Sequence, residues 1–378
     1  MSEEKYWLGF NRVKGIGPAK VRALLNHFSD LQSAWHAGEE QLRKIGFDKR
    51  AIDSLFAARE ELDLDQCLDD VQAIGVSLLT WNSEAYPSYL REIDGAPPLV
   101  YVHGSLEDID RWAVAVVGTR RLTSYGRQVT QELVTGLVLN GVTIVSGLAR
   151  GIDAIAHKTA LDHGGRTIAV LGSGPDCIYP PENRSLARQI VNGRGAVITE
   201  YGLGIQPEAK NFPPRNRIIS GLSLGVIVVE AGDRSGAGIT ARFALEQGRD
   251  VFAVPGNINS RASIGTNRLI QQGAKLVTGV DDVLEELNLA MVLEHSAVQL
   301  ALPETEDEVA ILDYLSAQPV HVDDLSRSTG LSSSVVSSTL TLMELKGMVR
   351  QVGGMNYVMA REPDPSYDAA GSDVKENV

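Results

Sequence analysis

The sequence of 378 residues predicts an α/β protein with an extended Rossmann-like parallel sheet, preceded by a helical module and followed by a winged helix. Within residues 71–287, short runs rich in valine and isoleucine alternate with helical patterns. Uninterrupted apolar runs are typical of strands buried on both faces of a parallel sheet. Their alternation with helices predicts a doubly wound domain. The expected strands cover residues 112–118, 141–147, 166–172, 196–201, 224–231, 250–256 and 274–279.

Residues 1–70 predict a small helical domain of the helix-hairpin-helix, or SAM-like, type. Apolar positions recur at helical spacing in residues 13–28, around a Gly-Ile-Gly-Pro turn. Pro18 suits the first turn of the second helix, where backbone N–H groups can meet a phosphate. A weaker copy of the pattern follows in residues 42–56. Plain helical turns in a small bundle are the alternative, and the sequence leaves both interpretations open.

The C-terminal part predicts a winged helix at residues 305–361, after a linker at residues 288–304. Three helical patterns precede a pair of strand-like segments joined by a two-glycine turn. Residues 304–360 hold three basic and eight acidic residues, a net charge of -5. This charge argues against contact with duplex DNA and favours contact with a protein. The composition of residues 362–378 is typical of disorder.

The charge of the chain is unevenly distributed. The net charge is -13, yet residues 111–275 contain 19 Lys and Arg against 11 Asp and Glu, a local excess of +8. Sixteen of those 19 basic residues are arginine, whose planar guanidinium suits phosphate. This pattern indicates a nucleic-acid-binding middle within an acidic protein. An evenly mixed, solvated surface is the alternative.

Several classes of site and location are disfavoured. The two cysteines, Cys67 and Cys177, lie far apart and form no CxxC pair, which disfavours a zinc site or a disulfide framework. No apolar run is long enough to predict a membrane span, and no secretory signal is recognised, so a cytoplasmic location is expected. The first core strand leads into GTRRLTSYG instead of GxGxxG, and no Walker-type sequence occurs. We therefore expect no dinucleotide, ATP or metal cofactor.

Glycine and arginine gather where expected strands end, which predicts a phosphate or nucleic-acid site. Ligands of open parallel sheets bind beyond the carboxyl ends of the strands. Glycine lets backbone N–H groups approach an anion, helix N-termini add partial positive charge, and arginine adds charge-assisted hydrogen bonds. An Arg-Asn-Arg cluster also precedes the fifth expected strand. The candidate residues are Gly118, Thr119, Arg120, Ser146, Gly147, Arg150, Gly151, Arg215, Asn216, Arg217, Arg234, Ser235, Gly236 and Thr240.

Structural roles compete with this interpretation at each position. A glycine at a strand end is often only a packing turn, and the Arg-Asn-Arg cluster can instead form ion pairs with buried acids. Asp153 is expected to be a helix N-cap and not a general base. His157 and His163 are expected on a helix face, because no matched carboxylate or cysteine accompanies them.

The ordered motifs of residues 75–285 resemble those of the bacterial DNA-processing protein A (DprA/Smf) family. They include the segments GTR, SGLARGID, AVLGSGPDCIYPPEN, FPPRNRIISGLS and SGAGITARFALEQGRDVFAVPG. The resemblance implies a homodimer that binds incoming single-stranded DNA, protects it and loads RecA recombinase onto it during natural transformation and recombination. It implies a DNA pocket lined by Gly118, Arg120, Ser146, Gly147, Gly151, Arg215, Asn216 and Arg217. Arg150 and Arg234 are added on charge and position.

Two other functions are weighed against this one. Nucleotide phosphoribohydrolases of the lysine-decarboxylase-like type resemble this fold and carry a catalytic glutamate in a PGGxGTxxE loop. In the comparable segment here, Ala241 and Arg242 stand where carboxylates are needed, and Glu246 lies too far along the helix. We therefore expect no enzyme. A regulator that reads duplex DNA through the winged helix is disfavoured by the acidity of that module.

Overall fold

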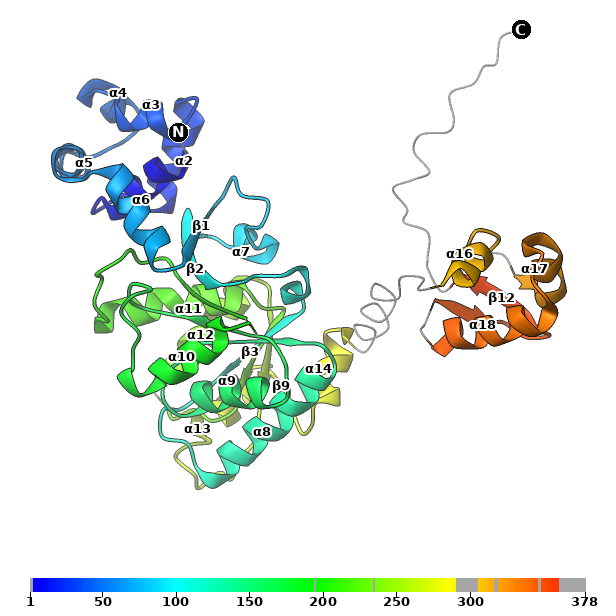
Figure 1. The fold of residues 1–378 in the computed structure, drawn as a ribbon. Helices are drawn as coiled ribbons and strands as arrows, with labels where there is room; N and C mark the ends of the chain where they lie inside the picture. Colours follow the sequence, from blue (N-terminus) through cyan, green and yellow to red (C-terminus); the bar gives the residue numbers. More distant parts are fainter. Residues whose placement is uncertain are drawn as a thin grey trace, which may run out of the picture. The chain divides into compact units, whose positions relative to one another are not determined.

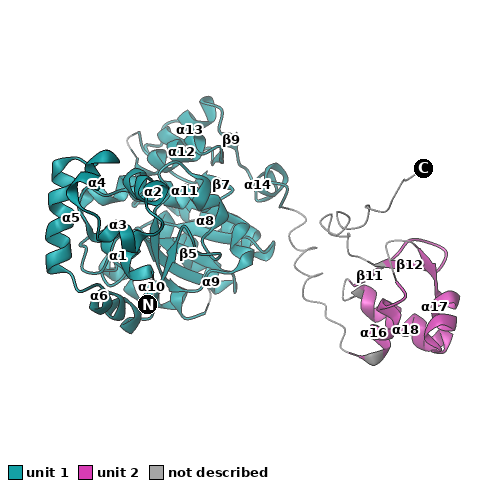
Figure 2. Cartoon of the chain, turned by 90° about the horizontal axis from the view of Figure 1, so that it is seen from above, with its two compact units in different colours: residues 1–290 teal, residues 291–378 magenta. Residues whose placement is uncertain are grey.

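The computed structural model describes residues 3–289 except Arg194 and Arg234, and residues 305–315, 319–345 and 348–359. The chain divides into two compact units, Met1–Ala290 and Met291–Val378 (Figure 2). The expected tail and almost all of the expected linker lie outside the described residues.

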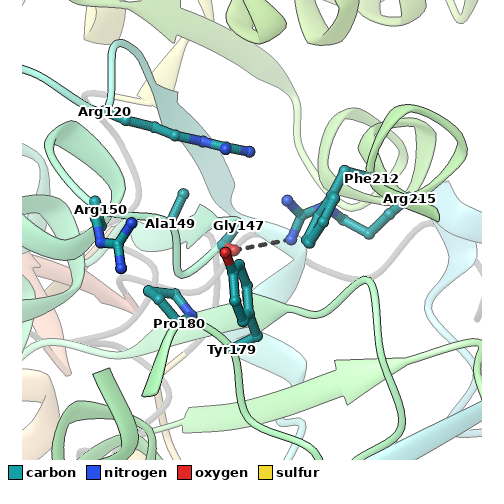
Figure 3. A pocket seen from close by; sticks show the side chains of 8 residues that line it. All are labelled: Arg120, Gly147, Ala149, Arg150, Tyr179, Pro180, Phe212 and Arg215. Atoms are coloured by element: carbon teal, nitrogen blue, oxygen red, sulfur yellow. Dashed lines mark hydrogen bonds between the residues drawn. The ribbon is translucent and has the colours of Figure 1, made fainter. Parts of the chain in front are cut away.

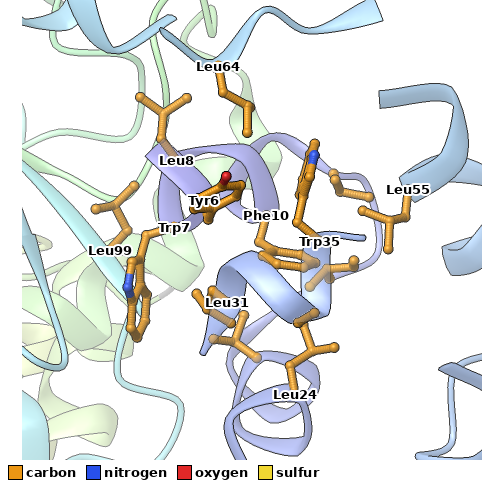
Figure 4. Packing of buried hydrophobic residues seen from close by; sticks show 14 of the residues in the cluster. Tyr6, Trp7, Leu8, Phe10, Leu24, Leu31, Trp35, Leu55, Leu64 and Leu99 are labelled. Atoms are coloured by element: carbon orange, nitrogen blue, oxygen red, sulfur yellow. The ribbon is translucent and has the colours of Figure 1, made fainter. Parts of the chain in front are cut away.

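The first unit begins with a helical module. Its buried residues form one apolar core, in which Phe10 and Trp35 meet edge to face with ring centroids 5.1 Å apart (Figure 4). Pro18 occupies the first position of the second helix, as the sequence predicts. Phosphate contact by this hairpin stays a prediction. In the described part of the module the helices are α1 (Glu4–Arg12), α2 (Pro18–His27), α3 (Leu31–Trp35), α4 (Glu39–Lys44), α5 (Lys49–Glu61) and α6 (Leu64–Ala73).

A large, mostly parallel sheet forms the centre of the first unit (Figure 1). Its order in the described chain is β1-β2-β6-β5-β4-β3-β7-β8-β9. The strands β3 to β9 run parallel, and the order reverses at β3, which pairs with both β4 and β7. The strands are β1 (Val76–Thr80), β2 (Leu99–Gly104), β3 (Ala113–Val117), β4 (Thr143–Ser146), β5 (Thr167–Val170), β6 (Gly195–Thr199), β7 (Gly225–Val228), β8 (Asp250–Ala253) and β9 (Lys275–Leu276).

Helices cover both faces of this sheet (Figure 1). In β5, Ile168 and Val170 join the core that packs against α11 and α12, whereas Ala169 joins the core beneath α10. The strand is thus buried on both faces, which confirms the predicted doubly wound architecture. The helices are α7 (Ser88–Glu92), α8 (Ser124–Leu139), α9 (Ile152–Asp162), α10 (Arg184–Val191), α11 (Phe212–Gly221), α12 (Gly236–Glu246), α13 (Ile264–Gln271) and α14 (Asp281–Glu286), with single 3-10 turns η1 (Asp108–Arg111), η2 (Pro181–Asn183) and η3 (Ala209–Asn211).

An antiparallel extension joins the helical module to the sheet. Strands β1 and β2 pair antiparallel with each other, and β2 pairs antiparallel with β6. Leu78 and Leu99 belong to the core of the helical module. The Tyr101 hydroxyl donates to Asn11 Oδ1 at 3.1 Å, and Asn11 Nδ2 donates to the Glu200 carbonyl oxygen at 3.1 Å. These two strands could not be predicted from the sequence, because their pairing depends on contacts with the distant helices.

The second unit is a winged helix, as predicted. Its three short strands form a sheet of order β10-β12-β11, and its core includes Ile311, Leu325, Leu340 and Tyr357. The described elements are α16 (Glu306–Leu312), β10 (Val320–His321), α17 (Val322–Thr329), α18 (Ser333–Leu345), β11 (Val349–Gln351) and β12 (Asn356–Met359). Across the described parts of both units, no helix has the length and apolar composition that crossing a membrane requires.

Candidate nucleic-acid interface

A basic and aromatic pocket lies beyond the carboxyl ends of β3, β4 and β5 (Figure 3). Loops that follow these three strands form it together with the first turn of α11. This is the end of the sheet, close to the reversal of strand order, where parallel α/β proteins bind ligands. The residues that line it are Arg120, Gly147, Ala149, Arg150, Tyr179, Pro180, Phe212 and Arg215.

Arg215 forms the buried wall of the pocket and is only 4% exposed. Its Nη1 atom donates to the carbonyl oxygens of Gly147, at 2.8 Å, and Val170, while Nε donates to Asn216 Oδ1 at 3.2 Å. A Cβ atom on Gly147 would lie 2.7 Å from Arg215 Nη2, so only glycine lets the guanidinium lie across this loop. Burial lowers the pKa of Arg215 to about 10, which leaves the group charged at neutral pH.

Asp153 supplies a buried negative charge close to Arg215. Its carboxylate accepts hydrogen bonds from the backbone N–H groups of Gly147, at 3.1 Å, and Ala149, at 3.3 Å. Burial raises the pKa of Asp153, and the charge of Arg215 opposes that rise. The expected role of Asp153 as a helix N-cap is wrong, because Gly151 caps α9 and the Asp153 carboxylate binds the preceding loop.

His157 of α9 is fully buried, and the positive charge of Arg215 acts on its imidazole. Its Nδ1 lies 2.6 Å from Thr167 Oγ1, and that hydroxyl donates its single proton to the Ile144 carbonyl oxygen at 2.8 Å. The imidazole must therefore carry its proton on Nδ1 and donate to Thr167. Burial, assisted by the Arg215 charge, lowers the pKa of His157 to about 3. The histidine is a neutral core residue of its helix.

Arg120 reaches the same pocket from the loop after β3. It is exposed, and within the described chain it takes part in no ion pair. Its guanidinium lies 5.7 Å from the centroid of the Phe212 ring. The loop is held firmly, because Thr119 N–H donates to the Glu230 carbonyl oxygen at 2.8 Å. Gly151, with φ of 81°, packs so closely that a Cβ there would lie 2.2 Å from the Thr119 carbonyl oxygen.

A second buried carboxylate, that of Glu230, occupies the beginning of α8. It accepts hydrogen bonds from Thr123 N–H, at 3.0 Å, and from Thr123 Oγ1, at 2.5 Å. Glu230 and Asp153 thus fill the places where a dinucleotide pyrophosphate would meet backbone N–H groups at helix N-termini. The residues present do not fit a dinucleotide.

The third arginine of the pocket, Arg150, already forms an ion pair within the protein. Its side chain is 56% exposed and forms an ion pair with Glu182, which lies in η2 at the edge of the pocket. Arg150 therefore lines the pocket as the sequence predicts, but it is not a free cation.

Arg217 lies away from this pocket. Its Nη1 and Nη2 donate to the two carboxylate oxygens of Glu200, each at 2.6 Å, and its Nε donates to the Gly95 carbonyl oxygen at 3.0 Å. Residues two apart on a helix point in directions roughly 200° apart. Arg215 and Arg217 must therefore face different surroundings, and Arg217 does not line the pocket as the sequence predicts. Its guanidinium instead forms a structural ion pair with Glu200, the alternative that the sequence left open.

Two further candidates belong to the packing around the pocket. Ser146 is completely buried, and its hydroxyl donates to the Val116 carbonyl oxygen at 2.6 Å. Gly118 is pressed against Ile152, where a Cβ would lie 2.5 Å from the isoleucine side chain. Both residues shape the loops, and neither lines the pocket.

The glycine-rich segment before α12 is not part of the pocket lining either. Ser235 caps the helix by accepting a hydrogen bond from Ala237 N–H at 3.3 Å. Thr240 is buried in α12, whereas Gly236 is exposed and its carbonyl oxygen accepts from Asn216 Nδ2 at 3.4 Å. Arg234 lies outside the described residues.

Two aromatic residues that were not among the sequence candidates, Tyr179 and Phe212, complete the pocket. The rings of Tyr179 and Phe212 lie 5.8 Å apart between centroids and are tilted by 43°. Phe212 contacts both basic groups, because Arg215 also lies 5.7 Å from its centroid. Aromatic side chains beside arginine are the platform on which unpaired bases stack. Each of the two aromatic residues precedes a proline, in the segments AVLGSGPDCIYPPEN and FPPRNRIISGLS. These segments were the sequence signal from which the two rings could have been assigned to the site.

The fold and the pocket define a class: an extended Rossmann-like protein with a basic, aromatic site at the carboxyl ends of its strands and a winged helix after it. Residues 77–288 match the family model of DNA recombination-mediator protein A, and residues 295–355 match that of the DprA winged helix domain. Protein Smf of Escherichia coli (strain K12) is 41% identical over 369 residues, covering 96% of this chain and 97% of the relative.

Two solved structures are similar to this chain. DNA processing protein A (DprA) from Streptococcus pneumoniae is 38% identical with a TM-score of 0.67, covering 75% of this chain and 97% of that one. DNA processing protein A from Helicobacter pylori, described there with a single-stranded DNA binding mode, is 32% identical with a TM-score of 0.51, covering 56% of this chain and 95% of that one. This chain belongs to the DNA-processing protein A (DprA/Smf) family.

Proposed function

We propose that this protein binds single-stranded DNA in the pocket formed by Arg120, Arg215, Tyr179 and Phe212. One observation carries the proposal: two guanidinium groups from distant parts of the chain meet at the same aromatic ring, Phe212. Guanidinium groups suit phosphate, and aromatic rings suit the faces of bases. A nucleic-acid strand is a ligand that offers both phosphates and base faces, one after the other along its length.

The arrangement favours single strands over duplexes. Base stacking on an aromatic side chain contributes about 1–3 kcal/mol per base and requires an unpaired base. In a duplex the base faces are covered by their neighbours, so Tyr179 and Phe212 have nothing to stack on. Arg215 is held in place before binding by Gly147 and Val170, so little ordering is needed when DNA arrives.

The proposed role is binding without catalysis. In the described lining of the pocket there is no carboxylate. In α12, where the phosphoribohydrolases carry their catalytic glutamate, Ala241 is buried and Arg242 pairs with Glu246 at 3.5 Å. We expect the purified protein to release no base from nucleoside monophosphates. Release above a blank, abolished by substitution of Arg120, would contradict a binding-only role.

The proposal extends to the wider pathway. Membership of the family supports loading of RecA recombinase onto the bound strand, protection of incoming DNA in natural transformation, a homodimeric state and a cytoplasmic location. An edge strand can pair with a strand of a second copy. Both residues of the edge strand β9, Lys275 and Leu276, are exposed. Pull-down of purified RecA with and without single-stranded DNA tests the partner directly.

The central experiment compares two DNA ligands at one salt concentration. Fluorescence anisotropy with a labelled strand of about 20 nucleotides, and with its duplex, should give at least tenfold tighter binding of the single strand, about 1.4 kcal/mol. Equal affinity for the two ligands would remove the proposed role of the aromatic rings. Phe212→Leu is the matched variant, since it retains an apolar side chain but loses the stacking surface.

A further inference from the structure

We infer that the outer face of α10 carries the DNA backbone away from the pocket, binding phosphates through Arg184 and Arg188. The inference rests on the proposed function, because it extends the pocket into a track. The track along α10 gives the bound strand a direction away from the pocket, and neither the family match nor the pocket lining determines that direction.

The beginning of α10 is fixed to the rim of the pocket. Tyr179 and Pro180 line the pocket, η2 follows immediately, and α10 starts at Arg184. Asn183 Nδ2 donates to the Leu148 carbonyl oxygen at 2.8 Å and to the Ala149 carbonyl oxygen at 3.3 Å. Ala149 also lines the pocket. A strand that leaves the pocket on this side therefore meets the first turn of α10.

Helical spacing aligns the two arginines. Ala187 and Ile190 are buried and pack in the core beneath the helix. Arg184 and Arg188 are both exposed and are four residues apart, so they stand one turn apart on the outer face. Their Cα atoms are separated by about 6 Å along the helix axis, given a rise of about 1.5 Å per residue. The two side chains make a short basic stripe that starts at the pocket.

The charges on this stripe are not neutralised within the protein. Among the described residues neither arginine takes part in an ion pair, in contrast to six other arginines of the first unit that do pair with carboxylates: Arg150, Arg166, Arg217, Arg242, Arg249 and Arg268. Residues 184–192 contain no acid. Like charges one turn apart destabilise a helix, so an anionic ligand is the natural complement of this face.

The opposite direction, along α8, is less suited to phosphate. Arg121 and Arg127 are also exposed and, in the described chain, unpaired. The beginning of α8, however, holds the buried carboxylate of Glu230 against Thr123, and Glu132 lies further along the helix. A phosphate chain on this side would meet the Glu230 carboxylate, which forms no ion pair among the described residues, and Glu132 about two turns into the helix. Glu182, which precedes α10, is instead paired with Arg150. The electrostatics therefore favour α10.

The test uses the full chain and two oligothymidylates, one of about three nucleotides that fills only the pocket and one of about 20. The double variant Arg184→Gln and Arg188→Gln keeps the helix and removes both charges. Each phosphate neutralised in single-strand binding contributes about 0.7 to the salt slope. Loss of two contacts should flatten the slope for the long strand by about 1.4, which is roughly a 7-fold smaller loss of affinity between 50 and 200 mM salt. Binding of the short strand should not change.

Matched variants separate the outcomes. Arg121→Gln with Arg127→Gln removes two exposed charges from α8 and should leave both affinities and both slopes unchanged. An unchanged slope for the α10 variant, or a larger effect of the α8 variant, overturns the inference. Failure of the proposed function has a different signature: Arg120→Gln then leaves binding of the short strand at the wild-type level. Melting temperatures and the two single variants guard against a fold defect in the double variant.

Discussion

Charged residues are paired differently in the winged helix and in the central domain, which is the part of the first unit built on the large sheet. Near the pocket, Arg120, Arg184 and Arg188 are exposed and, among described residues, have no acidic partner. In the winged helix, the described basic side chain Arg327 pairs with Asp324 at 3.1 Å. The helix α18, which corresponds to the recognition helix of a DNA-reading winged helix, contains no basic residue. We therefore expect contact with a phosphate backbone to be concentrated in the central domain, although the chain as a whole is acidic.

A similar contrast exists within one helix. Arg215 and Arg217 of α11 are both charged and both nearly buried, but Arg215 faces the pocket and Arg217 faces Glu200. Proximity in the sequence therefore says little about shared function when two residues lie on different sides of a helix. We expect the largest effects of substitution at the buried pocket wall and the smallest at the winged helix.

The largest effect is expected for Arg215→Ala. The substitution removes the hydrogen bonds of Arg215 to the Gly147 and Val170 carbonyl oxygens and the positive charge near buried Asp153, and a buried polar group left without its partner costs about 1–3 kcal/mol. Urea denaturation should show this loss, and anisotropy should show weak DNA binding at temperatures where the variant is folded. Adding Asp153→Asn should recover much of the stability without recovering DNA binding. A single variant as stable as the wild type would show that Arg215 is not electrostatically coupled to the carboxylate.

The second prediction concerns pH and the buried imidazole of His157. The folded-state pKa of His157 is about 3, against 6.5 for a free imidazole. Between these values the unfolded state binds more protons, so the free energy of unfolding falls as pH falls from 6.5 towards 3. The slope contributed by this residue is about 1.4 kcal/mol per pH unit at most.

Denaturation curves between pH 7 and pH 4 measure this slope. His157→Gln should flatten it. The raised pKa of Asp153 works in the opposite direction, because a carboxyl protonated more readily in the folded state gives stability that is lost as pH rises. The difference between wild type and His157→Gln therefore isolates the histidine. A slope that is the same in both proteins would mean that the imidazole titrates normally in the fold.

The third prediction compares Arg120 with Arg217. Arg120→Ala should remove about one phosphate contact, flatten the salt slope by about 0.7 and weaken binding to all sequences similarly. Its melting temperature should remain that of the wild type, because Arg120 is exposed. Arg217→Ala should do the reverse, lowering the melting temperature and leaving the slope unchanged, since it breaks the ion pair with Glu200. Wild-type affinity and slope in a stable Arg120→Ala protein would remove that residue from the site.

The smallest effect is expected when the winged helix is removed. A chain that ends at Ala290 retains the first compact unit and should bind single-stranded DNA within about threefold of the full chain, less than 1 kcal/mol. The reason is the net charge of -5 in residues 304–360, which offers little to phosphate. A tenfold loss would show that the module contacts DNA or orders the central domain, and it would erase the contrast between the two regions.

The parallel sheet and the winged helix could be predicted from the sequence. Continuous valine and isoleucine runs are typical of strands covered on both faces, so local composition indicated the parallel sheet. The pattern of three helices and a glycine turn likewise indicated the winged helix. Glycine and arginine at strand ends located the site, because carboxyl ends of parallel strands share one edge. Arg120, Gly147, Arg150 and Arg215 do meet there.

The tertiary structure alone decided which residue serves which purpose. It turned Arg217 towards Glu200, buried Ser146 and Thr240 in the packing, and brought Tyr179 beside Phe212. It also added β1 and β2 antiparallel to the sheet. Each of these outcomes depends on a partner that is distant in the chain. Periodicity in the sequence indicates whether a residue is buried. The residues that bury it are determined only when the loops assemble in the tertiary structure.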